Sequence, residues 1–195
     1  VDEGANLTDW PGVVGKYLGT GNQRSYTLRV DKDGKANFAI SDNGVWNGAF
    51  DFSAGPVLTP GEWYHLAATY TPSESMKIYV NGKEIEDPLT NNIPSSIFSG
   101  SAPLWIGVQN VTTSPTRYFP GQIDEVAVYN RALSEEQIAA HYQAAFSPAR
   151  DPAAISGLQA WYQIDNGTQL VHEASDGSYR ASAWQDSSVN NRTMQ

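Results

Sequence analysis

The sequence is dominated by short runs in which apolar and polar residues alternate, separated by residues that favour turns. In the run 25–30 the larger apolar side chains Tyr26, Leu28 and Val30 alternate with Ser, Thr and Arg, and the run 36–40 repeats the pattern. Alternation with a period of two places the apolar side chains on one face of a β-strand. Many such runs with turns between them are typical of an antiparallel sandwich. The sequence therefore predicts an all-β fold.

Two turns are marked clearly. The dipeptide Asn81-Gly82 follows the alternating run 76–80, and both residue types tolerate the positive φ of a two-residue hairpin. The segment 31–34, Asp-Lys-Asp-Gly, has the composition of a second turn. We expect each of them to join two neighbouring antiparallel strands.

Three further segments are predicted as strands: 63–70, 104–108 and 123–129. In the last of these the apolar positions shift between Ile123 and Val126, as they would at a β-bulge. The tryptophans within strand patterns are expected in the core, namely Trp63, Trp105 and Trp161.

One helix interrupts the strands. Ser134 is a good N-cap residue, and Gln137 three positions later completes a capping box. Ile138, Tyr142 and Ala145 then fall on one helical face. The pattern predicts a short helix from Ser134 to Ala145 that packs on the sandwich through this face.

Charge and composition exclude several classes of function. The 195 residues contain 12 Lys and Arg against 21 Asp and Glu, a formal net charge of −9. We therefore expect no nucleic-acid partner and no anionic membrane surface, because both need a basic face. No apolar run of about 18 residues exists, so no membrane insertion is expected. The chain has no cysteine, which excludes disulfides and thiolate sites.

The composition changes after the helix. Residues 147–156 contain two prolines and no periodicity, which predicts a linker. A new strand pattern begins at Leu158, but 157–195 holds too few residues to bury a core of its own. The expected organisation is a domain at 1–146, a linker at 147–156, and the start of a second, incomplete unit at 157–195.

Three segments together resemble the laminin G-like, concanavalin A-like jelly-roll family in its bacterial or phage form. They are 61–70 (GEWYHLAATY), 76–83 (MKIYVNGK) and 119–134 (FPGQIDEVAVYNRALS). Their order is also that of the family. The resemblance implies an antiparallel jelly-roll sandwich of two sheets with one short C-terminal helix.

The resemblance also implies that the first copy lacks its N-terminal strands. Residues 157–162 and 184–191 are similar to the beginning of such a domain, with Val189 where the family prefers Gly. Three explanations remain open. The chain is a segment of a tandem array, or 157–195 supplies strands to 1–146, or it completes a neighbouring molecule and so mediates self-association.

Catalysis is not expected. Glycoside hydrolases with this jelly roll use a Glu-x-Asp-x-x-Glu strand that supplies a nucleophile and an acid. The nearest stretch here has Gln122 and Ala127 at the two Glu positions, and neither can fill those roles. The three histidines show no metal-binding spacing. We predict that the protein is not an enzyme.

Calcium is the cofactor that the resemblance implies. Many members bind one calcium ion between the head loop and the Ile-Asp-Glu strand, which by position implicates Asp124 in the first unit and Asp186 in the second. The alternative for Asp124 is a capping or pairing role. Asp31 and Asp33 are interpreted as turn residues, because the EF-hand Glu is missing.

Glycan binding is a common task in this family. Sugars are held by aromatic faces and by planar amide or charged groups. Four loop residues have this character: Trp46, Asn47, Arg117 and Tyr118. Trp46 could instead close the end of the sandwich.

Two functions therefore remain. The first is a carbohydrate-binding or adhesion module of a multi-domain surface protein, assisted by calcium. The alternative is a structural module that makes protein–protein contacts in a surface layer, fibre or virion. Both predict an extracellular or cell-surface location, or a virion surface, with a glycan or a surface protein as partner.

Overall fold

The computed structural model describes residues 1–5, 7, 9–110, 112, 114–145, 158–162, 168–173 and 179–185. The chain divides into two units. The first comprises 1–122 and 132–150, and the second comprises 123–131 and 151–195.

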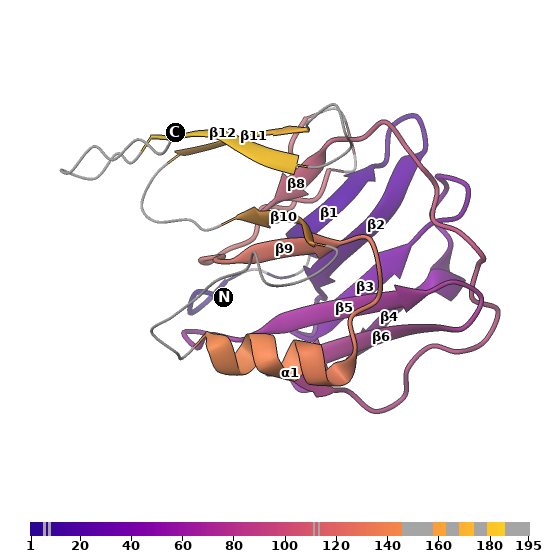
Figure 1. Ribbon diagram of the computed structural model, residues 1–195, viewed down its shortest axis with the longest axis horizontal. Helices are drawn as coiled ribbons and strands as arrows, with labels where there is room; N and C mark the ends of the chain where they lie inside the picture. Colours follow the sequence, from indigo (N-terminus) through magenta and orange to yellow (C-terminus); the bar gives the residue numbers. More distant parts are fainter. Residues whose placement is uncertain are drawn as a thin grey trace. The chain divides into compact units, whose positions relative to one another are not determined.

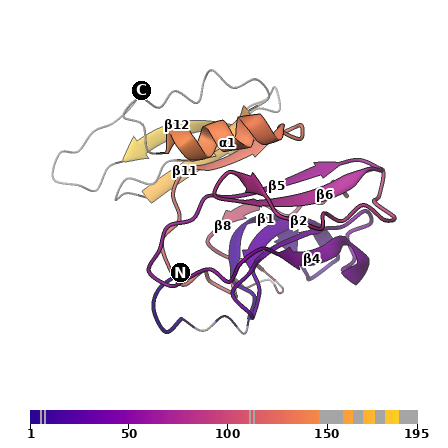
Figure 2. The ribbon, with the colours of Figure 1, turned by 90° about the horizontal axis from the view of Figure 1, so that it is seen from below.

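The first unit contains two antiparallel sheets that form two layers (Figures 1 and 2). One sheet has the order β4-β3-β2-β1-β8, made of β1 (Gly12–Leu18), β2 (Gln23–Val30), β3 (Ala36–Ile40), β4 (Asp51–Ala54) and β8 (Leu104–Ile106). The other has the order β5-β6-β7, made of β5 (Leu66–Thr71), β6 (Ser75–Val80) and β7 (Lys83–Glu84). The predicted jelly-roll sandwich is confirmed.

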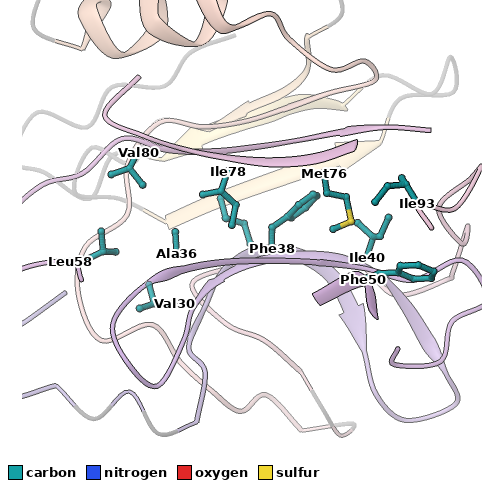
Figure 3. Close-up of a cluster of buried hydrophobic side chains, with 11 residues drawn as sticks. Val30, Ala36, Phe38, Ile40, Phe50, Leu58, Met76, Ile78, Val80 and Ile93 are labelled. Carbon is teal, nitrogen blue, oxygen red and sulfur yellow. The ribbon is translucent and has the colours of Figure 1, made fainter. Parts of the chain in front are cut away.

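The hydrophobic core lies between these layers. Met76, Ile78 and Val80 point from β6 toward Phe38 and Ile40 of β3 (Figure 3). All five belong to the alternating sets in the sequence, and each is at most 7% exposed. Burying a side chain of this size stabilises the fold by roughly 1.5–3 kcal/mol.

Both predicted turns are present. Asn81 (φ 51°) and Gly82 (φ 77°) join β6 to β7, and Val80 pairs with Lys83 across the turn. In the other turn, Oδ1 of Asp31 accepts the backbone N–H groups of Asp33 at 2.9 Å and Lys35 at 2.8 Å. Asp31 is thus a turn residue, as predicted.

Helix α1 (Glu135–Ala144) follows the strands of the first unit. Ser134 and Gln137 form the predicted capping box, and Ile138 is buried. Gly82 allows a close approach between hairpin and helix, because a Cβ there would lie 2.9 Å from Cβ of Tyr142. In the described part of the chain α1 is the single α-helix, and its ten residues are too few to cross a bilayer.

The strand containing Trp63 begins later than the sequence predicts. Residues 61–65 form a turn and a loop, and β5 starts at Leu66. Trp63 is therefore 66% exposed, and its assignment to the core is wrong. Trp105 is half-buried on β8, and the side chain of Trp161 lies outside the described residues.

The second unit contains two strand pairs. β9 (Val126–Tyr129) pairs antiparallel with β10 (Leu158–Tyr162), and β11 (Thr168–Glu173) pairs antiparallel with β12 (Tyr179–Gln185). β9 is shorter than predicted because Glu125 has φ 52°, which ends the extended chain and accounts for the shifted apolar pattern. The linker at 147–156 lies outside the described residues, and the boundaries 1–146 and 157–195 stay predictions.

Candidate functional site

The face of the five-stranded sheet that points away from the core is polar. In β2 the residues between the core positions are Ser25, Thr27 and Arg29, and all three are buried. A strand with both faces buried must satisfy its polar side chains within the protein.

The hydrogen-bond donors of Arg29 are satisfied by side chains from β3 and β4. Its Nε donates to Oδ1 of Asn37 on β3 at 2.7 Å, and its Nη2 donates to Oδ2 of Asp51 on β4 at 2.5 Å. The ion-pair side chains are only 5% and 10% exposed. Asn37 also donates to Oδ1 of Asp51 at 2.8 Å and to Ser53 at 3.0 Å. We call Arg29, Asn37 and Asp51 the sheet network.

Two loop residues enclose the network. The guanidinium of Arg29 lies over the ring of Trp10, 4.6 Å from its centroid. Gln109, with its amide oriented to satisfy both neighbours, accepts from Nη1 of Arg29 at 2.8 Å and donates to the carbonyl of Trp10 at 3.0 Å. The buried cation is thereby hydrogen-bonded at all three of its nitrogens.

Trp46 lies at the exposed edge of this network, in the loop between β3 and β4. Its indole N–H donates to Oδ2 of Asp51 at 3.0 Å. On another side the six-membered ring contacts Gly48, where an added Cβ would lie 3.1 Å from the ring. The side chain is nevertheless 57% exposed. The ring is therefore held in position while much of it remains open to a ligand.

Asn47 has a local structural role beside Trp46. Its Oδ1 accepts the backbone N–H of Ala49 at 3.0 Å and caps the short 3-10 helix η1 (Gly48–Phe50). This side chain helps to shape the loop, and its predicted contact with a ligand stays a prediction.

A small depression lies beside Trp46, and its lining includes Tyr17, Arg24 and Ser41. Arg24 lies over the ring of Tyr17, 5.5 Å from its centroid, and its Nε donates to the hydroxyl of Tyr17 at 3.1 Å. Sequence reasoning missed Arg24 and Tyr17. No local signal marks them, because Arg24 has the same parity as the core positions Tyr26 and Leu28, and the register shift that pairs it with Tyr17 depends on the neighbouring strand.

The other predicted pair lies at the opposite edge of the same sheet. Tyr118 forms a β-bridge with Val108, just beyond β8, and is 65% exposed. Arg117 (φ 54°) accepts the backbone N–H of Gly12 with its carbonyl. Four strand spacings separate β8 from β4, roughly 19 Å. The structure therefore does not bring Arg117 and Tyr118 together with Trp46.

Residues 5–139 match the family model described as the concanavalin A-like lectin/glucanases superfamily. The chain belongs to this superfamily. The matched region contains every residue of the sheet network and the depression.

Among proteins with similar sequences are the mouse and rat forms of "Sushi, von Willebrand factor type A, EGF and pentraxin domain-containing protein 1". The identities are 27% and 26% over 127 residues, or 60% of this chain. The aligned part spans 4% of each of those proteins. A crystal structure of a "putative carbohydrate binding protein" from Bacteroides ovatus ATCC 8483 is also similar. Its TM-score is 0.62 at 24% identity, covering 89% of this chain and 47% of that one, which shows a shared fold.

In this superfamily member the positions compared with the hydrolase pattern are Gln122 and Ala127, neither of which titrates. His65 precedes β5 and lies against Tyr142, with ring centroids 6.1 Å apart. Burial lowers the pKa of His65 to about 4, and His141 lowers it further, so the ring is neutral at pH 7. Its Nδ1 is enclosed and has no hydrogen-bond partner among the residues that the structure describes. These features suit a packing role, and the absence of catalysis stays a prediction.

In the part of the chain that the structure describes, the predicted calcium ligands provide few oxygen atoms for a metal ion. Asp124 is exposed, and its Oδ1 accepts the backbone N–H of Glu125 at 2.8 Å. Asp186 lies outside the described residues. No group of three His, Asp or Glu side chains suited to a metal occurs within the described ranges. Calcium takes six to eight oxygens, so Asp124 with these neighbours does not fit such a site, and calcium binding stays a prediction.

Proposed function

We propose that this superfamily member is a non-catalytic glycan-binding module that holds a sugar ring against Trp46. The observation that carries the proposal is that the side chain of Trp46 is both exposed and held in place. It is 57% exposed, yet its N–H is bonded to the buried carboxylate of Asp51 and its ring contacts Gly48.

The physical reason is preorganisation. Sugars present C–H surfaces that pack on aromatic faces, and their hydroxyls need polar partners nearby. A ring that is already fixed loses little rotational freedom when the ligand binds, so more of the contact energy appears as affinity. Of the residues that line the depression beside Trp46, Arg24 adds a charged group, whereas Ser41 is buried and its hydroxyl already donates to the carbonyl of Val45.

The similar proteins support this proposal without deciding it. The Bacteroides ovatus protein is described as carbohydrate binding, at a similarity that establishes the fold alone. The mammalian relatives are multi-domain proteins. We therefore propose an extracellular or surface location, where a module of this kind meets glycans or surface proteins.

A glycan array tests the proposal, run first with calcium and then with chelator. Wild-type protein should retain a subset of glycans, and Trp46→Ala should lose them. Trp63→Ala is the matched control, because it removes another tryptophan that is 66% exposed but lies in the loop before β5. Equal loss in both variants would contradict the assignment to Trp46. Binding that is lost only when the chelator is present would support the predicted dependence on calcium.

A second candidate function is protein–protein contact in a surface layer, fibre or virion. The observation that favours it is exposed apolar surface away from Trp46, at Val57 (59%), Trp63 and Tyr118. Backbone bonds from Gly61 to the carbonyl of Val1, and from Asp2 to that of Pro120, join the loops that carry Trp63 and Tyr118. Two results together would favour this function. The protein would bind no glycan on the array, and it would self-associate in sedimentation experiments in a way that Trp63→Ala abolishes.

A further inference from the structure

We infer that the glycan held beside Trp46 is acidic, and that its anionic group binds the guanidinium of Arg24. This inference rests on the proposed glycan-binding function and specifies the class of ligand.

Arg24 and Trp46 belong to one site. Both line the small depression, together with Tyr17 of β1 and Ser41, which follows β3. A sugar that stacks on the exposed ring of Trp46 therefore has Arg24 as the nearest charged group of the lining.

The guanidinium of Arg24 is fixed by neutral partners. Its Nε donates to the hydroxyl of Tyr17 at 3.1 Å, and its Nη1 donates to Oδ1 of Asn22 at 3.1 Å and to the carbonyl of Gly44 at 3.2 Å. Among the described residues nothing bonds to Nη2. Two N–H groups of a held cation thus remain for a ligand.

No carboxylate of the described residues forms an ion pair with Arg24. The chain as a whole has 21 acidic residues and a net charge of −9. Asp51, which accepts the indole N–H of Trp46, is paired with Arg29. The exposed Asp42 of the same loop acts electrostatically on Tyr70 of the other sheet. Arg24 thus lines the depression without an ion-pair partner among the described residues.

A guanidinium in this state favours an anion over a hydroxyl. Hydrogen bonds between charged groups are about twice as strong as neutral ones, and the bonds already made remove most of the cost of ordering the side chain. The anionic group is a carboxylate, as in a uronic acid, or a sulfate ester on the sugar. The shared chemistry is a pyranose ring that stacks on Trp46 and carries a negative charge within reach of Nη2.

Matched polymers test the inference by isothermal titration. Polygalacturonate is compared with its carboxyl-reduced form, and dextran sulfate with dextran, which separates carboxylate from sulfate as the anion. Wild-type protein should bind at least one acidic polymer about tenfold or more tighter than its neutral partner.

Three variants locate the effect. Arg24→Gln should weaken binding of the acidic polymer by about tenfold to a hundredfold, which corresponds to the usual contribution of a charged hydrogen bond. Lys83→Gln removes the same charge from β7 of the other sheet and should leave affinity unchanged. Arg24→Lys keeps the charge without the guanidinium geometry and should lose less than Arg24→Gln. It also serves as the test if Arg24→Gln fails to fold.

The outcomes separate the two proposals. If neutral and acidic polymers bind equally, and Trp46→Ala loses both while Arg24→Gln loses neither, the acidic specificity is wrong and glycan binding stands. If Arg24→Gln and Lys83→Gln weaken binding equally, the attraction is a general charge effect and the inference is overturned. If no glycan of any kind binds, the proposed function itself has failed.

Discussion

Oδ2 of Asp51 accepts the indole N–H of Trp46 at 3.0 Å, so a buried carboxylate orients an exposed ring. The same oxygen accepts from Arg29, and Asn37 binds the other oxygen. The position of the surface aromatic therefore depends on side chains inside the protein. Stability and binding should respond together when this carboxylate is changed.

The buried ion pair should be costly to break. We expect Asp51→Ala to lower the free energy of unfolding by about 3–5 kcal/mol, because Arg29 would remain charged and buried without its partner. Urea denaturation at pH 7 measures this. The control is Asp33→Ala, which removes an exposed pair with Lys32 and should leave stability nearly unchanged. A similar cost for both variants would contradict the importance of burial.

Gly48→Ala should separate binding from stability. The added methyl would lie 3.1 Å from the Trp46 ring, which must shift by a few tenths of an ångström. We expect glycan affinity to fall by about threefold to tenfold, near 1 kcal/mol, with little change in thermal stability. Titration with the best glycan of the array and a melting curve give the two readings. Unchanged affinity would show that the ring position is unimportant.

Gly82→Ala should destabilise the protein more than a simple change of backbone preference does. Gly82 has φ 77°, and an added Cβ would lie 2.9 Å from Cβ of Tyr142 on α1. Left-handed strain costs roughly 1–2 kcal/mol and overpacking roughly 1–3 kcal/mol more. Gly21→Ala is the control, because Gly21 has φ 72° but no atom closer than 4.0 Å. Equal losses in urea denaturation would show that α1 adjusts freely.

Stability should fall in mild acid through His65. Its pKa is lowered to about 4 in the folded protein by burial, against 6.5 when unfolded. The unfolded chain therefore binds more protons between these values. The stabilisation is complete above pH 6.5 and is lost as the pH falls toward 4, by about 3 kcal/mol in all.

The measurement is the free energy of unfolding at pH 7 and pH 4 for wild type and His65→Gln. The difference between the two pH values should be smaller in the variant. Burial also lowers the pKa of His141, so some dependence should remain. An identical pH dependence in both proteins would exclude His65 as its source.

The features that could be predicted from the sequence are those set by neighbouring residues. The Asn81-Gly82 hairpin and the Ser134–Gln137 capping box depend on a few adjacent positions, and both are present. The alternating sets likewise identify most of the core, since side-chain direction follows the period of the strand.

The features that could not be predicted depend on distant residues. Arg29, Asn37 and Asp51 meet only because β2, β3 and β4 pair in one register, which local patterns do not specify. Trp63 fits the strand motif in sequence, but the loop before β5 leaves it exposed. The sequence places Trp46 in a loop, and it is exposed in the structure. Its partners Asp51 and Gly48 could be identified only from the structure.

The ion pair on the outer face of the sheet also has a consequence for assembly. Leu28 and Val30 face the core while Arg29 faces away from it. If β2 slipped by one residue against β3, each side chain of β2 would move to the other face of the sheet. The charge of Arg29 would then be buried among the apolar core side chains around Phe38. Every slip by an odd number of residues carries that penalty, so the charge of Arg29 disfavours those registers.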